Sequence, residues 1–193
     1  MRRLLTVIPL AAIGLGAIGA AILYCCALHA QHEATAFLSA LSDAQVGVTS
    51  RDEFMKLTAR FKELESQSTG SDCRGEKCLT GPSLGFENSA FGKFILFPPT
   101  IVAVGVYFDS NDIYQGSMVT LDRYGTASVH VEEGPEAMTK AVNPAPHFGN
   151  VEKLHLHLDP AHRHDLARLR VSCFTSWFGC DTARELVSGE IVP

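Results

Sequence analysis

Residues 100–133, TIVAVGVYFDSNDIYQGSMVTLDRYGTASVHVEE, contain the pattern that decides the fold. Aromatic and β-branched side chains, which favour strands, dominate the runs Thr100–Asp109, Ile113–Asp122 and Thr126–Glu133. The dipeptides Ser-Asn and Tyr-Gly separate these runs and are typical of tight turns. The segment therefore predicts an antiparallel meander. Its first run is apolar on both faces, so we expect it to be the central strand.

Shorter elements are expected outside this meander. Further strands are predicted at Phe94–Phe97, Lys153–Leu158 and Leu169–Cys173, and helical turns at Asp159-Pro160 and Asp181–Leu186. Glycine and proline punctuate residues 67–93 and 134–150, which predicts a polar break with loops in the first range and a long surface loop in the second.

Helices are expected before the strands. Residues 30–44 are rich in Ala and also contain the helix formers Leu, Gln and Glu, with apolar residues three and four apart. Ser50 lies three residues before Glu53, a capping box that predicts the start of a second helix over about residues 51–66. Helices followed by strands indicate an α+β domain, with helices packed on one antiparallel β-sheet.

The N-terminal part has the composition of a membrane segment. Leu4–Leu28 has no charged side chain, and these 25 residues would rise roughly 37 Å as a helix. The hydrocarbon core of a bilayer is roughly 30 Å thick. An arginine pair precedes the segment and the next Lys or Arg is Arg51, so the N-terminus is expected in the cytoplasm. We predict a single-pass transmembrane signal anchor at residues 1–30 and an extracytoplasmic domain at residues 31–193.

Other targeting segments fit these residues less well. The apolar run is longer than that of a cleavable signal peptide, and the best cleavage site, Leu28-His29-Ala30, begins with a large residue. Lipoprotein processing needs a small residue before the cysteine, whereas Tyr24 precedes Cys25. The residues around the arginine pair make twin-arginine export a poor alternative. Cleavage after residue 30 stays an open alternative.

The cysteines of the exported part form two close pairs, Cys73 with Cys78 and Cys173 with Cys180. In an oxidising compartment such pairs predict local disulfides, although four cysteines allow three connectivities. The alternative is a four-thiolate zinc site, whose usual ligand spacing barely covers the first pair and does not cover the second.

The charge of the exported part limits its partners. It carries 14 Lys and Arg against 21 Asp and Glu, a formal charge of −7. An acidic surface disfavours nucleic acid and anionic lipid headgroups. The membrane is expected as a partner only through residues 4–28.

One motif could indicate a hydrolase. Gly81-Pro82-Ser83-Leu84-Gly85 matches the nucleophile elbow G-x-S-x-G, and Asp159 and several histidines follow in the hydrolase order. A cysteine loop precedes the motif where a buried strand is required, and Pro82 fixes φ at the strained turn. The motif therefore predicts a turn and no catalytic residue.

Histidines are dense near the C-terminal end. Residues 147–164 hold five, and in the alternating stretch Leu154–Leu158 two of them, His155 and His157, share the solvent face of a predicted strand. Two imidazoles at this spacing can reach one ion. A Zn²⁺ or Cu²⁺ site formed by His155, His157 and His162 is one interpretation. The simpler one is a polar strand face with no metal.

Two resemblances concern location and fold. Val46-Gly47-Val48-Thr49-Ser50, followed by Glu53-Phe54, a helix and strands, resembles the start of the SmpA/OmlA (BamE-like) envelope domains. Residues 30–193, with their two close cysteine pairs, also resemble uncharacterised N-terminally anchored bacterial envelope proteins. These resemblances imply an envelope location and no known activity.

The sequence thus predicts a non-enzymatic, membrane-anchored envelope protein, a binding or assembly module that needs no cofactor and whose partner is an unknown envelope protein or ligand. An extracytoplasmic metal-binding protein that uses the histidine strand is the alternative. A serine hydrolase acting through Ser83 is a more distant one.

Overall fold

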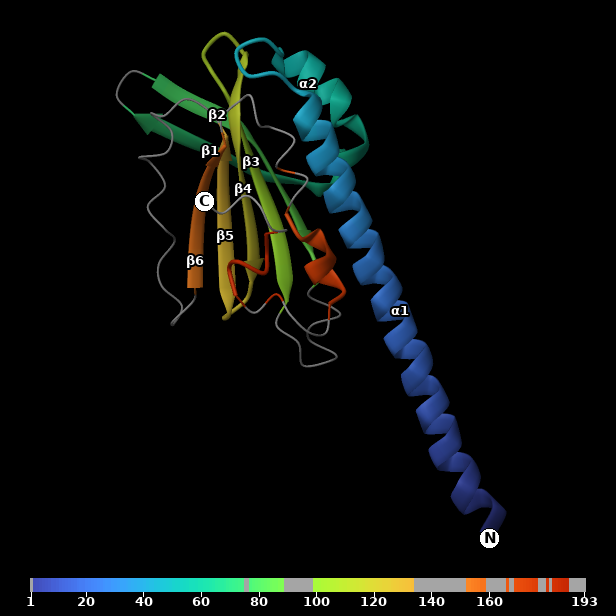
Figure 1. Ribbon diagram of the computed structural model, residues 1–193. Coiled ribbons are helices and arrows are strands. Elements are labelled where there is room, and N and C mark those ends of the chain that lie inside the picture. Colours follow the sequence, from blue (N-terminus) through green and yellow to red (C-terminus); the bar gives the residue numbers. More distant parts are fainter. Residues whose placement is uncertain are drawn as a thin grey trace.

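The computed structural model describes residues 2–74, 77–88, 99–133, 152–158, 166, 169–176, 180 and 182–187. The elements are the α-helices α1 (Arg2–Asp43) and α2 (Arg51–Leu57), the 3₁₀ helices η1 (Ala59–Leu64) and η3 (Val171–Phe174), and the strands β1 (Glu65–Arg74), β2 (Lys77–Glu87), β3 (Thr100–Phe108), β4 (Tyr114–Arg123), β5 (Ala127–Glu133) and β6 (Glu152–Leu158). Figure 1 shows a single sheet beside α1, whose N-terminal half extends far beyond the sheet.

Within the described residues, six strands form one sheet in the order β1-β2-β3-β4-β5-β6. The predicted meander is confirmed as β3, β4 and β5, which pair antiparallel, and the strand predicted at Lys153–Leu158 is confirmed as β6. The α+β content is confirmed as well. A wholly antiparallel sheet is wrong, because β6 pairs parallel with β5. The 18 residues of 134–151 provide the long connection that a parallel pair requires.

The loops predicted within residues 67–93 are wrong over much of that range. Strands β1 and β2 form an antiparallel hairpin there, and β2 pairs with β3. β1 is the edge strand, composed almost entirely of polar residues, and it is held by backbone pairing on one side. It therefore lacks the apolar alternation on which strand prediction depends.

The second helix is shorter than predicted. α2 ends at Leu57, η1 follows, and β1 already begins at Glu65. The capping box at its start is confirmed, since the hydroxyl of Ser50 accepts from the backbone N–H of Glu53. The backbone N–H of Ser50 donates to the Glu53 carboxylate at 3.0 Å.

The strand predicted at Leu169–Cys173 is wrong. Leu169 forms only an isolated bridge, and Val171–Phe174 is the 3₁₀ helix η3. Two carbonyl groups of η3 accept side-chain hydrogen bonds, from the Asn88 amide at 2.6 Å and from the Thr100 hydroxyl at 3.4 Å. Donors on side chains, rather than on a neighbouring strand, thus form hydrogen bonds with these two carbonyl groups of η3.

Three further sequence predictions have a partial counterpart or none among the described residues. Phe94–Phe97 and Asp159-Pro160 lie outside the described ranges. Of the helical turn predicted at Asp181–Leu186, residues 183–186 form a hydrogen-bonded turn and no helix.

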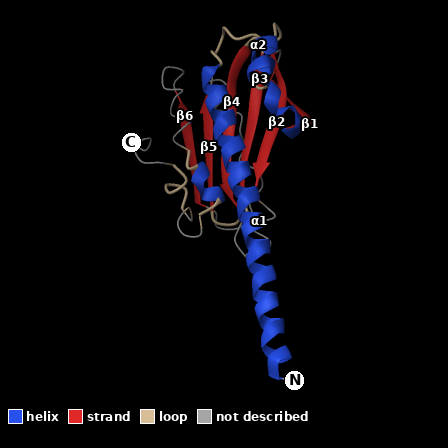
Figure 2. Cartoon of the chain, turned by 90° about the vertical axis from the view of Figure 1, so that its right-hand side faces the viewer, coloured by secondary structure: helices blue, strands red, loops and turns tan. Residues whose placement is uncertain are grey.

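Strand alternation gives the sheet two faces. On the core face, buried apolar residues of neighbouring strands lie in register, such as Val102 with Leu121 and Leu121 with Val129. The C-terminal half of α1 lies in front of the sheet in Figure 2. There the Phe37 ring is 5.8 Å from the Phe86 ring of β2. We call the face opposite the core face the outer face.

One stripe of α1 belongs to the core. Ala34, Phe37, Leu38 and Leu41 are buried, at the three- and four-residue spacing of one helix face, while Thr35 is exposed. The helix passes residue 30, the predicted domain boundary, without a break. Burial begins slightly earlier, at Ala27.

The cap of α2 contains a titratable group, the Glu53 carboxyl. Hydrogen bonds from the backbone and the hydroxyl of Ser50 lower the pKa of the Glu53 carboxyl below its ordinary value of 4.5. A carboxyl whose pKa is lowered by folding stabilises the folded state above the unfolded pKa, and that contribution is lost as the pH falls through the folded pKa.

We therefore expect Glu53→Gln to be less stable than the parent at pH 7 and to match it once the pH is below the folded pKa. Ser50→Ala should lose about 1 kcal/mol at pH 7. Urea unfolding across an acid series measures both, with Asp52→Asn in the same helical turn as the matched control. Parallel pH profiles for the parent and Glu53→Gln would contradict this account of the cap.

Candidate functional site

Polar residues of β4, β5 and β6 lie in register across the outer face. The rows are Thr120–His130–His155, Met118–Glu132–His157 and Asp122–Ser128–Lys153. His130 and His155 are thus direct neighbours on adjacent strands, and so are Glu132 and His157. These four positions are the corners of a rectangle, about 4.8 Å wide between strands and about 6.6 Å long between alternate residues.

His130 is held in place by two hydroxyl groups. Its Nδ1 lies 3.1 Å from the Thr120 hydroxyl, and its Nε2 lies 3.2 Å from the Ser128 hydroxyl. A neutral imidazole donates from one nitrogen and accepts at the other, and a hydroxyl can do either. Each tautomer is therefore satisfied. Beside this half-buried ring, Glu132 is only 4% exposed.

The two histidine positions predicted on one face of β6 are two residues apart, so strand alternation puts them on the same face. Their register partners on β5 are His130 and Glu132. The side chains of His155 and His157, and all of His162, lie outside what the structure describes. Among the side chains it does describe, no three potential ligands are grouped as a metal site.

The sequence interpretation missed His130 and Glu132. Both alternate with buried valines along β5, so their common face could be inferred from the sequence. Their position beside His155 and His157 could not, because it depends on the parallel register of β5 and β6.

Ser83 does not lie on a nucleophile elbow. It lies within β2, paired with Ser66 on one side and Gly105 on the other. A strand interior cannot supply the sharp strand-to-helix turn that exposes such a serine. The turn predicted for this motif is also wrong, because the whole pentapeptide is strand. Asp159 lies outside the described residues.

A buried polar cluster joins α2 to the sheet. The Tyr114 hydroxyl donates to Glu133 at 2.9 Å, and the Ser117 hydroxyl donates to the same oxygen at 3.4 Å. The Phe54 ring of α2 stacks on Tyr114 with 5.6 Å between centroids. All four residues are almost completely buried, so the cluster is closed to a ligand from solvent.

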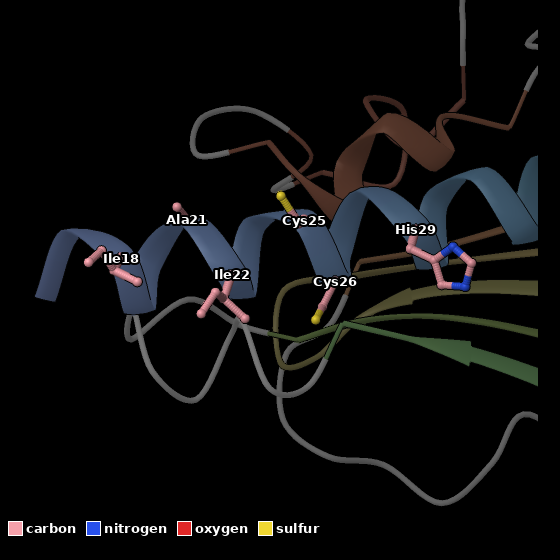
Figure 3. Close-up of a pocket in the computed structure, with 6 residues that line it drawn as sticks. All are labelled: Ile18, Ala21, Ile22, Cys25, Cys26 and His29. Carbon is pink, nitrogen blue, oxygen red and sulfur yellow. The ribbon is translucent and has the colours of Figure 1, made fainter. Parts of the chain in front are cut away.

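The exposed part of α1 has a shallow recess along one side. It is lined by Ile18, Ala21, Ile22, Cys25, Cys26 and His29. In the view of Figure 3, Cys25 lies above the helix ribbon and Cys26 below it, and both line this recess. The recess is formed by a single helix and is apolar. By length and composition, this helix can cross a membrane.

The two cysteine pairs are both local in the fold. Cys173 and Cys180 form a disulfide. Cys73 and Cys78 are directly opposite each other in the β1–β2 hairpin, which brings their backbones close. The link between this second pair stays a prediction.

Comparisons with family models, with curated proteins and with solved structures found no match for the chain. The two resemblances drawn from the sequence therefore stay expectations.

We expect non-reducing peptide mapping of the exported protein to find the links Cys73–Cys78 and Cys173–Cys180. Replacing Cys173 and Cys180 together with serine should cost about 2 kcal/mol, because the unfolded chain regains the freedom of a short closed loop. Cys25 and Cys26, free and exposed on α1, are the matched control pair and should give no change when replaced with serine. A cross-link between the two pairs, or four free thiols, would refute this framework.

Proposed function

We propose that the chain is a membrane-anchored envelope protein whose α+β part lies outside the cytoplasm and acts as a binding or assembly module. The observation that carries the proposal is the division of α1. Between residues 12 and 28 most of its large apolar side chains are exposed, whereas a stripe of its C-terminal half belongs to the core of the sheet.

The apolar half of α1 needs a non-aqueous environment. Ile13, Leu15, Ile18 and Ile22 are 58–71% exposed. Burying such a side chain contributes about 1.5–3 kcal/mol each, which a bilayer would supply. Because the helix is continuous, the sheet would be held directly at the membrane surface.

Two observations support the placement of the sheet on the non-cytoplasmic side of the membrane. The arginine pair before the apolar run favours a cytoplasmic N-terminus. The disulfide between Cys173 and Cys180 is typical of an oxidising compartment and fits export of the sheet.

Binding has more support than catalysis. Ser83, the one residue with a hydrolase motif, lies in a strand interior, so the serine hydrolase is the weakest alternative. Metal binding is the second candidate function, favoured by the register of His130 and His155. It is compatible with the same anchor.

The topology is tested by fusing a reporter enzyme that folds only outside the cytoplasm after Pro193, and by sequencing the mature N-terminus. We expect an active reporter on a chain that retains residues 1–30. A fusion lacking residues 4–28 is the control and should be inactive.

Either part of the topology can fail by itself. An inactive reporter on the full chain would contradict the orientation. A new N-terminus at Gln31 would contradict the anchor and leave export intact.

A further inference from the structure

We propose that His130, Glu132, His155 and His157 form a binding site for a divalent transition metal, Zn²⁺ above all, on the outer face of β5 and β6. This specifies the ligands of the second candidate function, metal binding, and is independent of the anchored binding module, which does not require a metal.

The register brings the four residues together. His130 and His155 are partners across the parallel pair, and Glu132 and His157 are the next partners on the same face. The four positions lie about 4.8 Å apart across the strands and about 6.6 Å apart along them. The diagonal of this rectangle is then about 8 Å, so the four backbone positions are near one another on one face of the sheet. The β5 pair and the β6 pair are more than twenty residues apart in the sequence, so no local sequence motif indicates this site.

The donor set selects the ion. Three imidazoles and one carboxylate suit Zn²⁺ or Cu²⁺, whereas Mg²⁺ and Ca²⁺ prefer oxygen ligands alone. Four such ligands match the tetrahedral coordination of Zn²⁺. Loss of one ligand to water would leave three imidazoles or two imidazoles and a carboxylate, both of which also bind Zn²⁺.

Thr120 would position His130 for the metal. When the Thr120 hydroxyl accepts from Nδ1–H, at the 3.1 Å separation in the structure, Nε2 carries the lone pair that a metal needs. The Ser128 hydroxyl now lies 3.2 Å from that nitrogen and would turn aside when the ion binds. Thr120 is thus a positioning residue, and Ser128 is a competitor.

The surroundings favour a cation. Glu132 is almost completely withdrawn from water, where a nearby positive charge stabilises a carboxylate. The adjacent row contributes Asp122 and Lys153, one charge of each sign, and the row of Glu132 continues into the uncharged Met118.

The test uses the full chain in detergent micelles, without a histidine tag and with Cys25 and Cys26 replaced by serine, because exposed thiols bind zinc themselves. Zn²⁺ is titrated in competition with a chromophoric chelator. We expect one equivalent to bind at pH 7.5 and to be released below about pH 6, where imidazoles protonate.

Affinity should fall at least about 100-fold in His155→Gln/His157→Gln and at least about 10-fold in His130→Gln. The matched control is His29→Gln/His32→Gln on α1, which should change affinity less than about twofold. Thr120→Val should weaken binding about 10-fold and Thr120→Ser should restore it, which a purely structural role would not require.

A second measurement needs no substitution at the site. Zn²⁺ should slow the chemical modification of His130, His155 and His157 together and leave that of His29 unchanged. Failure to bind micromolar Zn²⁺, full affinity in His130→Gln, or protection of other histidines alone would overturn the proposal.

Discussion

The fold depends on one helix that satisfies two environments. In its C-terminal half, α1 buries a single stripe, with Phe37 in edge contact with Phe61 at 5.1 Å and tilted against Phe86 at 5.8 Å. Among the side chains that the structure describes from residue 12 to residue 26 none is buried, and most of the large apolar ones are exposed. The helix runs without a break through both halves. With the proposed membrane anchor, the position of the sheet relative to the bilayer follows from the point, near Ala27, where burial begins.

Because successive side chains of a strand point to opposite sides, the sheet has an apolar core face and a more polar outer face. Valines and leucines of β3, β4, β5 and β6 fill the core face and hold the strands in register. That register places His130 beside His155 on the outer face. A slip of one residue would exchange the faces, so the apolar packing against α1 also fixes the polar arrangement. The packing of the core thus determines the strand register, and the strand register determines which residues of the candidate metal site are neighbours.

Much of this could be predicted from sequence, and the failures have physical causes. The strands around Val104, the cap at Ser50 and the apolar run of α1 each have a strong local pattern, and the structure contains all three elements. β1 was missed because an edge strand can be polar throughout. The strand predicted around Val171 became a 3₁₀ helix because partners distant in sequence satisfy its carbonyl groups. Of the candidate site, the sequence could place His155 with His157 and His130 with Glu132 on shared strand faces, but it could not bring the two pairs together, because that depends on the parallel register of β5 and β6.

The continuity of α1 from bilayer to core is tested most directly by a cysteine-accessibility scan. Single cysteines would replace residues 18–43 in turn, in a chain otherwise free of Cys25 and Cys26 and reconstituted in lipid nanodiscs. We expect no reaction with a water-soluble thiol reagent through about residue 26. Beyond it, accessibility should repeat every three to four residues, with His32, Thr35 and Ser39 reactive and Ala34 protected, as their exposure requires. Uniform reactivity through residue 26, or no such period after it, would contradict the account.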